Sequence, residues 1–117
     1  AIYGGSLAVA GATARAIASH KPEKVSLVAM GLEGKVKTDE DEQCALYLRN
    51  LLQGRKPDKD SVKALILAGE ESQKYDDPSL PQWPLEDRVM ALDIDSHNFA
   101  LRITKEDDFF VARPEYV

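Results

Sequence analysis

A short apolar run at residues 25–30 constrains the fold of this chain most. The run, Val-Ser-Leu-Val-Ala-Met, is nearly continuous in apolar residues and too short for a buried helix. Such runs are typical of strands that are buried on both faces of a parallel sheet. A helix is predicted just before it, over residues 6–19, where apolar side chains recur at helical spacing and small residues fill the opposite side. The pattern therefore predicts a parallel strand that is reached through a helix.

The first residues predict the strand that precedes this helix. Ala1, Ile2 and Tyr3 stand before a Gly-Gly pair, as the last residues of a strand would. Strand, helix and strand together form a right-handed crossover unit. Because the opening strand is so short and no initiator Met begins the chain, we expect residues 1–117 to be a single domain that belongs to a longer protein.

Three further helices and a hairpin follow. Amphipathic spacing predicts a helix over about residues 39–52, and a second, well-buried helix that begins at a capping Asp60. A short helix from Pro84 to about Leu92 precedes a terminal antiparallel hairpin over residues 99–114, where apolar and polar residues alternate around a charged turn. The predicted fold is α/β, with a mainly parallel sheet flanked by helices in three layers (α/β/α) and a C-terminal antiparallel hairpin.

Composition excludes several classes of partner. Fifteen Lys and Arg against twenty Asp and Glu give a formal charge of −5, so nucleic acid and anionic membranes are poor partners. No apolar run approaches the roughly 20 residues that span a bilayer. Cys44 is the only cysteine and allows no internal disulfide, so a reducing, cytoplasmic setting is expected.

Two glycine-containing turns leave strands at the same predicted edge of the sheet, where open α/β sheets bind ligands. In the first turn, Gly5 and Ser6 lead into a helix N-terminus, whose unpaired N–H groups and positive dipole end favour a phosphate. The alternative is a tight turn in which Ser6 caps the helix. Both interpretations stay open at the level of sequence.

The second turn brings carboxylates to this edge. Glu33 lies between Gly31 and Gly34, and Asp41 lies in the first turn of the next helix. Mg²⁺ takes oxygen ligands from one or two carboxylates, water and substrate phosphate, so Glu33 and Asp41 are candidate metal ligands and catalytic residues. Asp41 is also explained as the partner of Thr38 in a capping box, whereas Glu33 caps no predicted helix.

Other polar residues give no clear indication of a functional site. Asp93 and Asp95 are spaced to share a cation or a proton on one side of a strand, or simply to lie in water at its start. His20 ends a helix and is a natural partner of its dipole, and Cys44 lies on an apolar stripe as a small core residue. No pair of nucleophile and base is evident.

Several motifs resemble one family. Gly-Leu-Glu-Gly-Lys after the apolar run, and Glu-Asp-Glu-Gln-Cys-Ala at residues 40–45, are similar to the Ala-Gly-x-Glu-Gly and Glu-Asp-x-x-Cys-Ala motifs of the 2-phosphosulfolactate phosphatase family. Gly-Ser-Leu at residues 5–7 and Val-Ala-Arg-Pro at residues 111–114 resemble that family's turn and closing strands. The likeness spans nearly the whole chain but only the C-terminal half of the family, so the resemblance implies that residues 1–117 are the C-terminal half of a longer phosphatase-like protein. The chain departs from the family at Val9 and Leu46, where members often have Asn and Gly.

The resemblance implies a Mg²⁺-dependent phosphatase that removes phosphate from 2-phospho-3-sulfolactate, in a step towards coenzyme M. It implies phosphate binding by Gly5 and Ser6, and metal binding and catalysis by Glu33 and Asp41. The implied partners are a small phosphorylated organic acid and either further copies of the chain or the family's N-terminal half, without which the fragment would be inactive. The alternative is a non-catalytic α/β module for binding or assembly, with an unknown ligand.

Overall fold

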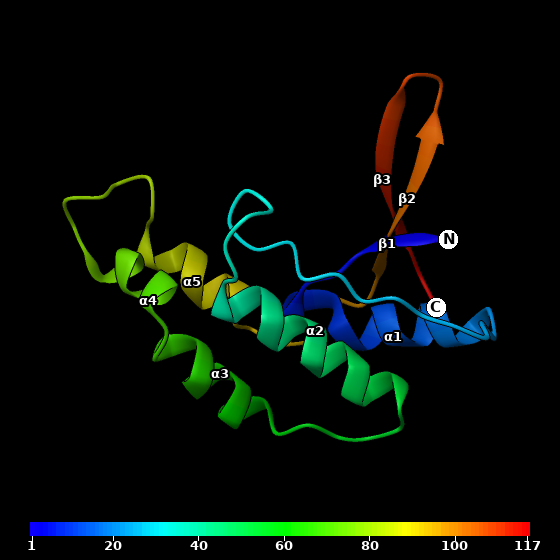
Figure 1. Ribbon diagram of the computed structural model, residues 1–117, viewed down its shortest axis with the longest axis horizontal. Coiled ribbons are helices and arrows are strands. Elements are labelled where there is room, and N and C mark those ends of the chain that lie inside the picture. Colours follow the sequence, from blue (N-terminus) through cyan, green and yellow to red (C-terminus); the bar gives the residue numbers. More distant parts are fainter.

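The sheet of this protein has three antiparallel strands in the order β1-β2-β3. In the computed structural model, which describes residues 1–117, β1 (Ile2–Gly4) pairs with β2 (Ala100–Glu106), and β2 pairs along its length with β3 (Phe109–Glu115). The β2–β3 hairpin projects from the helical part of the molecule, and β1 lies beside its base (Figure 1). The predicted C-terminal hairpin is confirmed. The predicted mainly parallel sheet in three layers is wrong, because both strand pairings are antiparallel.

The 25–30 segment, which was predicted to be a buried parallel strand, is extended but belongs to no sheet. Residues 22–30 take part in no backbone–backbone hydrogen bond. Val28 and Met30 are 75% and 68% exposed, respectively. A strand needs a neighbour that accepts and donates its backbone hydrogen bonds, and β1 is paired with β2 alone. The crossover prediction is therefore wrong: the apolar run adopts an extended conformation without a partner.

The helical part follows the sequence pattern closely. It consists of η1 (Leu7–Val9), α1 (Ala10–Ser19), α2 (Asp39–Leu52), α3 (Lys59–Leu67), α4 (Glu70–Gln73), η2 (Lys74–Asp76) and α5 (Leu85–Ala91). The predicted bounds of α2 are confirmed. α3 begins earlier than predicted, because Asp58 caps it by accepting a hydrogen bond from the Asp60 N–H. It is also less buried than predicted, since only Ile66 is buried and Leu65 is 57% exposed.

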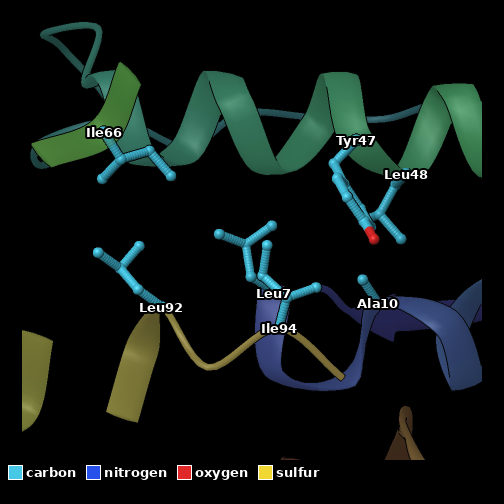
Figure 2. Close-up of a cluster of buried hydrophobic side chains, with 7 residues drawn as sticks. All are labelled: Leu7, Ala10, Tyr47, Leu48, Ile66, Leu92 and Ile94. Carbon is cyan, nitrogen blue, oxygen red and sulfur yellow. The ribbon is translucent and has the colours of Figure 1, made fainter. Parts of the chain in front are cut away.

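One hydrophobic cluster holds these helices together. Figure 2 shows side chains from α2 and α3 facing side chains from η1, the start of α1 and the segment after α5. The buried members are Leu7, Ala10, Tyr47, Leu48, Ile66, Leu92 and Ile94. The cluster lies among the helices rather than against the face of a broad sheet. No helix is long and apolar enough to cross a membrane.

Candidate functional site: a cavity between β1 and the 25–30 segment

One cavity of the molecule has a volume of about 830 Å³ and opens to solvent. It is lined by β1, by one side of α1 and α2, and by the unpaired 25–30 segment. Most of its lining is apolar, including Ile2, Ile17, Leu27 and Leu48. Pockets of this size and character are typical of ligand sites.

The structure brings two of the four predicted site residues to this cavity. Gly5 and Asp41 line it, whereas Ser6 and Glu33 do not. A Cβ atom at residue 5 would lie 3.0 Å from the Leu48 side chain, so close packing against α2 favours glycine there. Ser6 is exposed and precedes η1 without a capping hydrogen bond from its side chain. The Gly5 turn is therefore explained by packing, and Ser6 takes part only through its backbone carbonyl, which accepts a hydrogen bond from the Val9 N–H.

Asp41 joins the start of α2 to the end of the 25–30 segment. Its carboxylate accepts a hydrogen bond from the Gly31 N–H, with a nitrogen–oxygen distance of 2.7 Å. The predicted capping box is wrong, because the Thr38 side chain makes no capping bond and its hydroxyl is buried without a partner. The position of Asp41 thus fixes the loop that follows the segment.

Glu33 lies at the exposed tip of a tight turn, in which Leu32 pairs with Val36. Its φ of 53° is in the left-handed region. Gly31 has a φ of 69°, and a Cβ atom there would lie 2.2 Å from the Val36 carbonyl oxygen. The turn therefore requires glycine at residue 31 for its own geometry, and it holds Glu33 away from the cavity lining.

The phosphate cradle was predicted at Gly5 and Ser6, at the start of a helix from Ser6, but α1 begins only at Ala10 and its N-terminus already holds a carboxylate. Asp95 accepts a hydrogen bond from the Gly11 N–H at 2.7 Å and forms an ion pair with Lys59 at 3.2 Å. Its own N–H donates to the Leu7 carbonyl. A phosphate at this helix end would lie beside a like charge. In the sequence, Asp95 stands out only by its spacing from Asp93. This spacing predicts neither the hydrogen bond from α1 nor the ion pair with Lys59.

A polar network closes one end of the cavity, where Tyr3 and His20 line it. The Tyr3 hydroxyl donates to Glu115 at 2.5 Å and lies 2.9 Å from His20 Nε2. Arg102 donates to the same carboxylate at 3.2 Å. Burial, and next the Glu115 carboxylate, raise the pKa of Tyr3, while the Tyr3 hydroxyl and then Arg102 lower the pKa of Glu115. His20 ends α1 as predicted, and its ring contacts Tyr3.

The residues present do not fit a magnesium centre. No group of three or more His, Cys, Asp and Glu side chains is placed to hold a metal ion. Asp41 lines the cavity and Glu33 does not, so the two proposed ligands are not brought to one site. Cys44 also lines the cavity, but burial and, second, Asp41 raise its pKa to about 11, so it is a poor nucleophile at neutral pH.

No protein family, curated protein or solved structure matches this chain. The resemblance to 2-phosphosulfolactate phosphatases therefore stays a prediction from short motifs. Function has to be argued from the cavity and from the residues around it.

Proposed function

We propose that this chain is a binding module, and that its cavity between β1 and the 25–30 segment holds an apolar ligand. The observation that carries this proposal is the cavity itself, about 830 Å³ in volume and lined mostly by apolar residues. An exposed apolar surface of this kind is typical of a binding site, because covering it with a ligand is favourable in water.

The polar groups around the cavity favour binding over catalysis. Asp41 is hydrogen-bonded to Gly31, and Tyr3 is held by Glu115 and His20. These groups support the walls of the cavity instead of forming a set of nucleophile, base and metal ligands. We assign the module to the cytoplasm, because its single cysteine has no partner for a disulfide.

Binding of an apolar dye tests this proposal. We expect 8-anilinonaphthalene-1-sulfonate to fluoresce with the folded chain, and Ala45→Phe to reduce the signal at least about fivefold by filling the cavity that Ala45 lines. Ala64→Phe adds the same ring at an exposed site on α3, outside the cavity, and should leave the signal unchanged. Equal dye binding by the two variants would contradict the proposal.

A second candidate function is a part in Mg²⁺-dependent hydrolysis of a phosphomonoester, as the family resemblance implies. The observation that favours it is that Gly5 and Asp41, which lie far apart in the sequence, line the same cavity. Further metal ligands would have to come from another polypeptide, because this chain groups too few of them.

Hydrolysis of p-nitrophenyl phosphate by this chain would favour the second candidate. We predict no Mg²⁺-stimulated turnover by this chain alone, because stabilising a transferring phosphoryl group requires several preorganised charges. Turnover that Asp41→Asn abolishes would favour the hydrolase over the binding module. The asparagine retains an oxygen that can accept the hydrogen bond from Gly31, so the loop should keep its shape.

A further inference from the structure

We propose that the ligand of this cavity is an extended polypeptide strand, which pairs with β1 on one side and with the 25–30 segment on the other. This inference rests on the proposed function and names the class of ligand. The strand would come from a partner protein and would carry apolar side chains at alternate positions. Its insertion would turn the three-stranded sheet and the lone extended segment into a continuous sheet.

Unpaired backbone on both sides of the cavity is the first support. β1 pairs with β2 along one edge and with nothing along the other. Opposite it, residues 22–30 are extended and take part in no backbone–backbone hydrogen bond. Free strand edges are templates for an added strand, whose own N–H and C=O groups complete the ladder. An apolar small molecule would use none of these backbone groups.

The side chains along these two edges are the second support. Val28 is 75% exposed, Met30 is 68% exposed and Ile2 is 58% exposed, and all three line the cavity. Leu27, which directly precedes Val28, packs partly against the hydrophobic core and anchors the segment. A paired apolar strand would cover the exposed side chains while leaving this anchor in place.

Charge at the two ends of the cavity gives the strand a direction. Lys24 precedes the 25–30 segment, and Asp41 contacts Gly31 just after it, so a positive and a negative group lie at opposite ends of a stretch roughly 20 Å long at about 3.3 Å per residue. β1 and the segment run in the same direction (Figure 1). A strand whose basic N-terminal end lies near Asp41 and whose acidic C-terminal end lies near Lys24 would be antiparallel to both.

A pair of peptides with the same composition tests this assignment. The first probe is fluorescein-labelled Lys-Val-Thr-Val-Thr-Val-Glu with blocked termini, and the second exchanges its Lys and Glu. We expect the first peptide to bind at least tenfold more tightly than the second, as measured by fluorescence anisotropy. Equal affinity would overturn the proposed direction, and no binding of either peptide up to 1 mM, roughly the weakest interaction the method detects, would overturn the strand ligand.

Proline variants test the backbone pairing. Successive N–H groups of an extended chain point to opposite sides, so one of Val28→Pro and Ala29→Pro should weaken binding at least tenfold and the other should not. Neither N–H takes part in a hydrogen bond in the free chain, so both variants should fold. Val28→Ala is the matched control, because it shortens the same side chain and keeps the N–H. Unchanged binding by both proline variants would overturn the proposed site.

A modified peptide tests the same backbone pairing with the unchanged protein, so the result does not depend on whether the proline variants fold. Methylating alternate amide nitrogens of the first probe blocks pairing on one edge and retains its side chains. We expect at least a tenfold loss of affinity. If the dye binds but none of the peptides does, the strand ligand is rejected and the proposed binding module still stands.

Discussion

Asp95 fixes the first turn of α1 although it lies at the other end of the chain. Its carboxylate satisfies the Gly11 N–H, one of the donors that a helix N-terminus leaves unpaired, and it also pairs with Lys59 at the start of α3. One side chain therefore joins α1, α3 and the segment that leads into β2. The hydrogen bond to Gly11 and the ion pair with Lys59 account for the carboxylate at residue 95.

We predict that Asp95→Ala lowers the free energy of unfolding by at least about 1 kcal/mol, because it removes this cap and places alanine at a left-handed φ of 61°. Urea denaturation followed by circular dichroism measures the change. Asp93→Ala is the matched control, because Asp93 is a second carboxylate near Lys59 but it does not accept the hydrogen bond from Gly11, and its loss should change stability by less than about 0.5 kcal/mol. An equal loss in the two variants would show that Asp95 does not act as a cap.

Among the elements, those defined by local sequence were predicted and those defined by distant partners were not. Acidic residues in the first turn and an apolar stripe specify α2 from its own sequence, and the charged turn of the β2–β3 hairpin is equally local. The prediction of a sheet strand over residues 25–30 was wrong, because strand pairing depends on a neighbouring strand that the segment's own sequence does not specify. The candidate site shows the same limit. Sequence motifs indicate Gly5 and Asp41, but only the structure shows that these two line the cavity while Ser6 and Glu33 do not.

The strands β1 and β3 are joined by the Tyr3–Glu115 hydrogen bond, which should make stability depend on pH. The pKa of Glu115 is lowered in the folded chain, so the folded state favours the ionised carboxylate. Its contribution to stability is present above the ordinary value of 4.5 and is lost as the pH falls through the lower, folded value. We predict that Glu115→Gln unfolds at a lower temperature than the parent at pH 7, and that this difference shrinks below pH 4.5.

Glu106→Gln is the matched control for this acid dependence. Glu106 pairs with Arg113 on the exposed part of the hairpin and makes no contact with Tyr3. Thermal melts of the two variants between pH 7 and pH 3 measure the effect. A gap between Glu115→Gln and the parent that stays constant over this range would contradict the assigned role of the carboxylate.

At the scale of the whole molecule, the buried cluster and the cavity adjoin at Leu48, which belongs to both, whereas the exposed side chains of β1 and the 25–30 segment lie outside the cluster. The buried cluster lies among the helices, whereas exposed apolar side chains lie around the cavity and at the hairpin, where Phe109 and Phe110 are both more than 70% exposed. Self-association through these surfaces stays a prediction. Substitutions of the exposed lining residues Val28 and Met30 should therefore leave the core intact.

The core should therefore respond to substitution far more strongly than the surface of the same helix. We predict that Leu48→Ala lowers the free energy of unfolding by about 2–5 kcal/mol, because Leu48 is buried in the cluster. Leu46→Ala, two residues earlier on α2 and exposed, should cost less than about 1 kcal/mol. Similar losses in the two variants, measured by urea denaturation, would place the core elsewhere.

Amide hydrogen exchange of the free chain, resolved by residue, tests the central claim most directly. The binding site exists only if the 25–30 segment is unpaired before a ligand arrives. We predict that its amides exchange within about tenfold of the rate for an unstructured chain, while the central amides of β2, paired on both sides, are protected at least about a hundredfold. Comparable protection of the 25–30 segment and β2 would mean that the segment is already a sheet strand, and would contradict the account.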